Sequence, residues 1–329
     1  MIKKTLVGLM TVLLAVILAA GCGGGSGGSS GSGSKGEPTA KPKFPPRETT
    51  STRPVETFKI GDREGKVYAL ANFESKSYAR GSKIVVMGKS IYYYGKTPGT
   101  GKTQLVKVDY DKETLSPPVA VGESYDRGLH ILATNGKVVA YETGKGNRGF
   151  YDGKKAVEGK KFQEGAMAGG EKGGPFYMVH GVAAILTGTF SGGDFTQQKE
   201  IIKDYRRAPL RLQGAVVPVF ADEKGFYLAV DEKKSGAHEG EPTLIYLDRG
   251  GKEIRRFEGS EDQPRGWVVT ANYVIHAASK GAFRIFDRAT GAMVTELKLN
   301  MRPFDVALVK GNDVLVYDDQ AKKLYRVDF

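Results

Sequence analysis

A repeated pair of short strands constrains this chain more than any other feature. The segment at residues 283–297, FRIFDRATGAMVTEL, has two apolar, β-prone runs on either side of a tight turn. Asp287 opens the turn and Gly291 lies near its end. An Asp at the first turn position bonds the backbone ahead of it, and Gly accepts a positive φ. The segment therefore predicts a β-hairpin, and related copies recur along the chain.

The copies recur at a nearly fixed period. The turn aspartates are 43, 52, 44, 39 and 41 residues apart, at Asp109, Asp152, Asp204, Asp248, Asp287 and Asp328. A second set of strands, one upstream of each turn, begins at Ile91, Val138, Val182, Phe226, Tyr273 and Val314. Another apolar run precedes most of these strands, so each unit holds about four short strands.

Four-stranded units at this period predict an all-β chain folded as a single β-propeller over residues 55–329. One blade cannot bury both of its faces alone, whereas blades packed in a ring do. The copies predict six four-stranded blades, with seven as the alternative count and a β-sandwich as the alternative fold. The last unit reaches Phe329 one strand short. We therefore expect an N-terminal strand, best placed at residues 67–73, to close the ring.

The first 21 residues predict an export signal. Lys3 and Lys4 form a basic head, residues 6–20 are apolar, and small residues precede Cys22, which is the only cysteine. These features resemble the signal peptide and lipobox of bacterial lipoproteins. The resemblance implies cleavage before Cys22 and a lipid, diacylglycerol with palmitate, on the mature N-terminus. A transmembrane anchor is the alternative, but the apolar run is short of the roughly 20 residues that a span needs.

Residues 22–54 predict a flexible linker between the lipid and the propeller. Glycine and serine dominate residues 23–34, and prolines stiffen the part that follows. Such a chain has a reach of roughly 30 Å. We therefore expect an exported protein, lipid-anchored to the cell-envelope membrane, with the propeller outside the cytoplasm. In lipoproteins, an Asp directly after the lipidated Cys is associated with retention in the inner membrane, and this chain has Gly23 there. If the cell has an outer membrane, the resemblance therefore implies that the protein is anchored to it, with the propeller in the periplasm.

The net positive charge of the chain indicates which kinds of binding partner it favours. The formal net charge is +12, which favours anionic neighbours such as envelope glycans, lipid headgroups or acidic protein surfaces. We expect no nucleic acid outside the cytoplasm. The segment at residues 95–103, GKTPGTGKT, resembles the end of a phosphate-binding loop, but Lys96 stands where the pattern requires Gly. The residues after it alternate as a strand, whereas a phosphate loop needs a helix there. We therefore expect a loop between blade strands and no bound nucleotide.

A basic residue precedes several of the predicted innermost strands. The positions are Arg80, Arg127, Arg265 and Arg302. In a propeller this connection opens onto one mouth of the central channel, so these guanidiniums would converge there and suit a carboxylate or a phosphate. The alternative is structural, with each Arg bonding the neighbouring blade. The acids beside them (Asp126, Asp262 and Asp305) are either catalytic groups, calcium ligands or partners of these arginines.

No catalytic or metal-binding signature stands out. The four histidines (His130, His180, His238 and His276) share no ligand spacing. No Ser-His-Asp order or acid pair can be assigned from the sequence. We therefore expect no metal and no cofactor, name no catalytic residue, and favour a protein that is not an enzyme.

The hairpins, such as Asp287–Gly291, resemble quinoprotein-type and YVTN-type propeller repeats over residues 78–329. Trp267 is the only tryptophan, so the recurring Trp of quinone-cofactor repeats is missing. Together the repeats and the lipid anchor predict a binding or scaffold module for a protein or an anionic envelope polymer. The alternative is an envelope enzyme that acts on an anionic glycan or small substrate at the channel mouth.

Overall fold

The computed structural model describes residues 53–70, 83–96, 103–109, 119–124, 132–143, 148–158, 165–191, 194–232, 241–260 and 264–329. These residues form β-strands joined by turns, and no helix occurs among them. Consequently, no helix long and apolar enough to span a membrane is found in this part of the chain. Residues 46–329 cluster as one compact unit.

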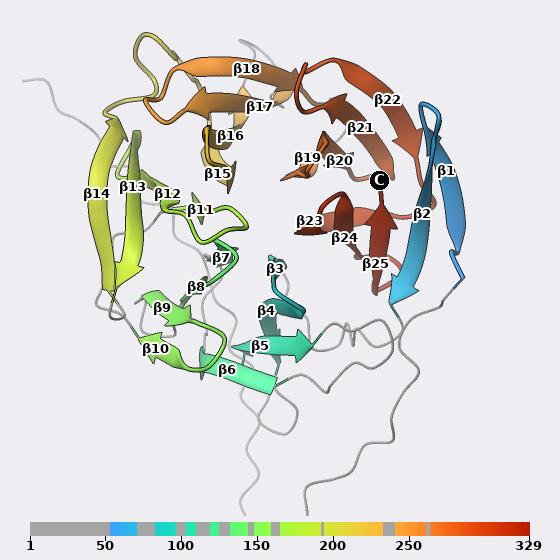
Figure 1. The fold of residues 1–329 in the computed structure, drawn as a ribbon, viewed down its shortest axis with the longest axis horizontal. Coiled ribbons are helices and arrows are strands. Elements are labelled where there is room, and N and C mark those ends of the chain that lie inside the picture. Colours follow the sequence, from blue (N-terminus) through green and yellow to red (C-terminus); the bar gives the residue numbers. More distant parts are fainter. Residues whose placement is uncertain are drawn as a thin grey trace, which may run out of the picture. The chain divides into compact units, whose positions relative to one another are not determined.

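The strands form six antiparallel sheets arranged around a central space (Figure 1). Blade 1 contains β3 (Val85–Met87), β4 (Ser90–Lys96), β5 (Thr103–Asp109) and β6 (Val119–Ser124). Blade 2 contains β7 (Leu132–Thr134), β8 (Val139–Glu142), β9 (Arg148–Tyr151) and β10 (Ala156–Glu158). Blade 3 contains β11 (Met167–Ala168), β12 (Phe176–His180), β13 (Ala184–Ser191) and β14 (Asp194–Ile202).

The second half of the ring continues in the same order. Blade 4 contains β15 (Val216–Ala221), β16 (Gly225–Glu232), β17 (Glu241–Asp248) and β18 (Glu253–Glu258). Blade 5 contains β19 (Pro264–Val269), β20 (Tyr273–Ala278), β21 (Ala282–Asp287) and β22 (Met293–Lys298). Blade 6 contains β23 (Pro303–Lys310), β24 (Asp313–Asp318) and β25 (Lys323–Asp328), followed by β2 (Arg63–Leu70) and β1 (Glu56–Ile60). The predicted six-bladed β-propeller is confirmed.

Blade 6 closes the ring with strands from both ends of the propeller. β2 pairs antiparallel with β25, with Val67 opposite Val327, and β1 adds a fifth strand outside β2 (Figure 1). Phe329 is fully buried, and its ring centroid lies 5.6 Å from that of Phe58 on β1. The expected N-terminal closure is therefore confirmed. The closing strand begins at Arg63, four residues earlier than the sequence indicated.

The hydrophobic core lies between blades. Because neighbouring residues of a strand point to opposite faces of its sheet, each blade packs against both of its neighbours. On β4, Ile91 and Tyr93 pack against blade 6, whereas Tyr92 and Tyr94 pack against blade 2. One buried cluster of this kind lies at each of the six blade boundaries in the described residues. A blade without its neighbours would expose both apolar faces.

The turn aspartates act as predicted in three of the hairpins between third and fourth strands, at Asp152, Asp248 and Asp287. Asp287 Oδ1 accepts hydrogen bonds from the backbone N–H and the hydroxyl of Thr290. Asp152 and Asp248 accept from backbone N–H groups two to four residues ahead. Gly291 has a φ of 80°, and a side chain there would meet Arg255. Asp109 is the last residue of the third strand β5, and the turn after it lies outside the described residues.

Blade 3 differs from the prediction. The strand expected to begin at Val182 is the third strand β13, and the second strand is β12. Asp204 consequently follows the fourth strand β14, where it accepts bonds from Arg206 instead of closing a hairpin. The prediction was wrong here because Asp204 imitates the turn aspartates of the other blades. The 52-residue spacing before Asp204, the longest of the five, was a sign of this displacement.

Candidate functional site

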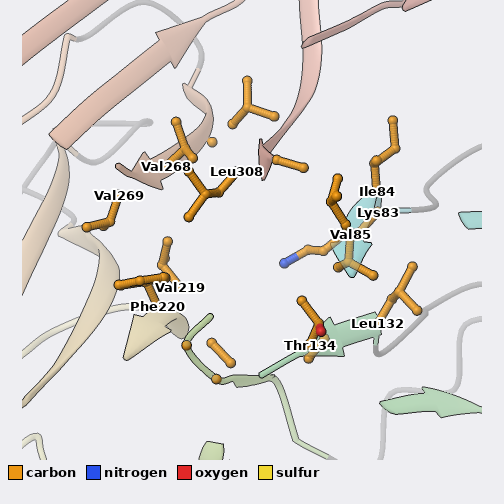
Figure 2. A pocket seen from close by; sticks show the side chains of 18 of the residues that line it. Lys83, Ile84, Val85, Leu132, Thr134, Val219, Phe220, Val268, Val269 and Leu308 are labelled. Atoms are coloured by element: carbon orange, nitrogen blue, oxygen red, sulfur yellow. The ribbon is translucent and has the colours of Figure 1, made fainter. Parts of the chain in front are cut away.

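The innermost strands β3, β7, β11, β15, β19 and β23 surround a central channel of about 550 Å³. We call the end where these strands begin the leading mouth; it is marked by Lys83 and Asp305. The end where they finish is the trailing mouth, marked by Glu171 and Lys310. The walls between the mouths are largely apolar, with valine and leucine side chains from several blades (Figure 2).

Lys83 and Asp305 carry opposite charges and lie close together at the leading mouth. Asp305 Oδ2 accepts a hydrogen bond from the Ile84 N–H, which links blade 6 to blade 1. Asp305 keeps partial access to the channel, but protein surrounds its carboxyl. Desolvation therefore raises the Asp305 pKa to about 7, against the attraction of Lys83 and the bonds from the Ile84 and Val306 N–H groups. A carboxyl in this state exchanges its proton near neutral pH.

A wider groove opens at the trailing mouth across blades 3, 4 and 5. It has a volume of about 1030 Å³ and shares Gly170, Glu171 and Phe220 with the channel. Its lining comes from the turns that follow the first and third strands of these blades and from strand residues next to those turns. The groove is larger than the channel and lies at the end opposite the predicted arginines. The sequence interpretation did not indicate it.

The side chain of Arg288 on blade 5 contacts several residues of blade 4 at the floor of the groove. Its Nη2 donates to Asp222 Oδ2 at 2.6 Å, and its Nε donates to Tyr227 Oη at 3.1 Å. Its Nη1 donates to the carbonyl of Thr270 at 2.7 Å. The guanidinium also lies 5.5 Å from the ring centroid of Phe220. The side chains of Arg288 and Asp222 are only 21% and 20% exposed, so this ion pair is largely shielded from water.

Two stacked tyrosines complete the floor. The rings of Tyr227 and Tyr246 lie 4.3 Å apart and nearly parallel. The Tyr246 hydroxyl donates to Asp222, whose Oδ1 also accepts from the Lys224 and Gly225 N–H groups. Desolvation and the Asp222 charge raise the pKa of Tyr246, and desolvation raises that of Tyr227. Both phenols therefore remain protonated at neutral pH, and because both residues are buried, they support the floor from beneath.

Charges of both signs line the rim of the groove. Lys172 pairs with Glu223 at 3.1 Å, and both side chains are well exposed. Arg255 donates to the carbonyl of Arg288 at 2.7 Å. Burial raises the pKa of Glu171, against the attraction of Arg288 and Lys172. The groove therefore offers a mixed-charge rim around an aromatic floor.

The predicted anion-binding arginines are only partly described. Arg80 and Arg127 lie outside the described residues, as do Cys22 and the acids Asp126 and Asp262. Arg265 lies on β19, but its side chain is also outside the described part. Arg302 precedes β23 as predicted, and its Nε lies 3.5 Å from Asp319 Oδ1. An arginine ring at the leading mouth therefore stays a prediction.

The other predicted features have mixed outcomes. β4 ends at Lys96 and β5 begins at Thr103, so the GKTPGTGKT segment connects two blade strands and is not followed by a helix. Among the described residues, no group of three or more metal-ligand side chains was found. His276 lies on β20 and is buried, and desolvation lowers its pKa to about 4. Its Nδ1 accepts from the Ser260 N–H, and its ring packs against Trp267.

A sequence signal for the groove did exist. An arginine follows the turn aspartate in both blade 4 and blade 5, as Asp248-Arg249 and Asp287-Arg288. Both arginines line the groove. Since turns of equivalent strands lie on the same face of a propeller, this repeated Asp-Arg pair indicated cations at the trailing mouth.

Comparison with known proteins yields the fold alone. No protein-family model matches the chain, and no curated protein matches it. A Bacteroides thetaiotaomicron protein of unknown function aligns with a TM-score of 0.51 and 14% identity, over 87% of this chain and 77% of that one. Kuenenia stuttgartiensis hydrazine synthase aligns with a TM-score of 0.49 and 16% identity, over 78% and 79%. The WD40 propeller domain of Doa1 aligns with a TM-score of 0.46 and 8% identity, over 76% and 94%.

Proposed function

We propose that this protein is a lipid-anchored propeller of the cell envelope that binds a protein partner in the groove at its trailing mouth. The observation that carries this proposal is the composition of the groove. Tyrosine and arginine dominate the residues that hold most of the energy in protein–protein interfaces. In this groove Arg249 is exposed and Tyr273, Arg255 and Arg288 are half-buried, while the buried Tyr227 and Tyr246 support them from beneath.

The charge pattern favours a protein segment over an anionic polymer. A polyanion is best bound by a surface of one sign, whereas Glu171, Glu223 and Asp287 lie among the cations of this groove. Ile254 on β18 also lines the groove and is 48% exposed. A segment with apolar and charged side chains would match both features. An anionic polymer at the leading-mouth arginines is the competing outcome of the test below.

The anchor is tested first by cell fractionation. Replacing Cys22 by Ala is expected to leave the signal uncleaved and unlipidated, because Cys22 is the only thiol that a lipid can modify. Metabolic labelling with a palmitate analogue should then drop to background, whereas Ser26→Ala should keep the label. Equal labelling of both variants would contradict the lipoprotein assignment.

The partner is tested by photo-crosslinking in cells. A photoreactive amino acid at Ile254 is expected to give a discrete protein adduct, and Arg249→Glu should remove that adduct by reversing a charge of the groove. The matched control is Val119 on β6, which is 57% exposed and lies on blade 1, away from the groove. Adducts that are identical at both positions, or that contain glycan without protein, would contradict the proposal.

A second candidate is an envelope enzyme that acts on a small anionic substrate in the channel. One observation favours it: Asp305, with a pKa near 7, lies beside Lys83 at the leading mouth. Perturbed carboxyl groups next to a cation are typical of general acid–base catalysts, although structural groups show such shifts too. Asp305 also bonds Ile84 between blades, and this structural role accounts for its position without a reaction.

A further inference from the structure

One arrangement of residues between neighbouring blades occurs twice near the trailing mouth. Each copy combines a Phe-Tyr pair on the second strand of one blade with an Asp-Arg pair at the end of the third strand of the next blade. The pairs are Phe226 and Tyr227 on β16 with Asp287 and Arg288 at the end of β21, and Phe176 and Tyr177 on β12 with Asp248 and Arg249 at the end of β17. The first copy lies between blades 4 and 5, and the second lies between blades 3 and 4.

The turns that follow the two Asp-Arg pairs contact the preceding blade in the same way. A side chain added at Gly291 would meet Arg255 on blade 4, and one added at Gly251 would meet Ile202 at the end of β14 on blade 3. Both glycines have a positive φ, of 80° and 85°. The two turns therefore take equivalent places, each against the blade before it.

The arginines of the two copies lie near the equivalent buried tyrosines. Arg288 Nε donates to Tyr227 Oη at 3.1 Å. In the other copy, desolvation raises the pKa of Tyr177, and the charge of Arg249 lowers it. Arg249 therefore lies close enough to the Tyr177 phenol to act on its ionisation, as Arg288 lies close to Tyr227.

The second copy lacks the carboxylate that completes the first. Asp222 is five residues before Tyr227, and its Oδ2 accepts from Arg288 Nη2 at 2.6 Å. Five residues before Tyr177 the chain has Lys172, which is a cation. The position that holds an acid in the first copy therefore holds a base in the second.

Arg249 has no acid of its own. Its side chain is exposed, and in the part of the chain that the structure describes it forms no hydrogen bond or ion pair. Glu171 has the only carboxyl group of the turn between β11 and β12. Burial raises the pKa of Glu171, and the cations that attract it are Arg288 and Lys172. The groove therefore contains an unpaired guanidinium at a place where the equivalent arginine forms an ion pair.

We propose that the protein partner supplies this carboxylate from an Asp or Glu side chain that pairs with Arg249. The pairing presupposes the partner proposed above and names the chemistry by which the groove recognises it. A guanidinium binds a carboxylate through two parallel hydrogen bonds. A partner that covers Arg249 would shield the new pair from water, which strengthens it. Ile254, exposed in the same groove, would contact an apolar side chain of the same segment.

The test uses the photoreactive amino acid at Ile254 of the full chain in cells, and mass spectrometry identifies the crosslinked segment of the partner. Arg249→Glu should lower the adduct yield at least tenfold, because it reverses one charge of a shielded interface pair. Lys252→Glu is the matched control and should keep the wild-type yield, since Lys252 is exposed in the same turn but does not line the groove. Thermal melts of residues 46–329, which contain every blade strand, should match for both variants and the wild type.

An exchange of charges then identifies the acid. Replacing one Asp or Glu of the crosslinked segment by Lys should remove the adduct of wild-type Arg249, and combining this change with Arg249→Glu should restore at least half of the wild-type yield. Absence of any protein adduct in the wild type would contradict the proposed function and the pairing together. A wild-type adduct that persists in folded Arg249→Glu, or that no exchange of charges restores, would overturn the pairing alone and leave the groove as a partner site.

Discussion

Deleting residues 323–329 is expected to abolish cooperative folding of the propeller. These residues form β25, which pairs with β24 on one side and with β2 on the other. Without β25, neither β1 nor β2 has a sheet to join, and the ring loses its closure. Leu324, Val327 and Phe329 are fully buried, so the deletion also opens the cores that blade 6 shares with blades 1 and 5.

The free energy of folding lost by this deletion is large enough that no partly folded propeller should remain. Truncating a buried Leu or Phe to Ala costs about 2–5 kcal/mol, and the deletion removes one of each and a buried Val along with two ladders of backbone bonds. That loss is comparable to the whole stability of a typical domain, about 5–15 kcal/mol. Circular dichroism should show no thermal transition. Deletion of residues 46–52, which precede every strand, should leave the melting temperature unchanged, and a truncated protein that melts normally would contradict the closure.

The sequence predicted the parts of the fold that local chemistry determines. The Asp-to-Gly turn of residues 287–291 specifies a hairpin through bonds between neighbours in the chain. Repetition of that hairpin determined the blade count, and the missing last strand determined the closure. Each of these inferences depends on residues close in sequence or on the number of repeats and strands.

The sequence did not predict what depends on contacts between blades. Arg148, on β9, is buried and donates to the Gly165 carbonyl, and desolvation lowers its pKa to about 10. Nothing near it in the chain distinguishes it from an exposed strand arginine. The groove was not predicted for the same reason. Asp222 and Arg288 are 66 residues apart in the chain and meet only because blades 4 and 5 are neighbours.

Replacing Arg288 by Met is expected to destabilise the propeller by about 2–4 kcal/mol. Removing one partner of a buried ion pair leaves an uncompensated charge and costs about 3–5 kcal/mol, and the residual exposure of Arg288 and Asp222 reduces that figure. The Tyr227 hydroxyl and the Thr270 carbonyl each lose a hydrogen bond as well. Urea unfolding followed by circular dichroism measures the change in the free energy of unfolding.

The matched control is Lys172→Met, which breaks the exposed Lys172–Glu223 pair on the same groove. Because exposed pairs contribute about 0–1 kcal/mol, this variant should lie within about 0.5 kcal/mol of the wild type. A cycle with Asp222→Asn then isolates the pair, and we expect Arg288→Met and Asp222→Asn to couple by about 1–3 kcal/mol. Additive effects would mean that Arg288 stabilises the fold through its bonds to Tyr227 and Thr270 and its packing on Phe220, and not through Asp222. Strong coupling would mean that one ion pair holds the groove floor together across the boundary between blades 4 and 5.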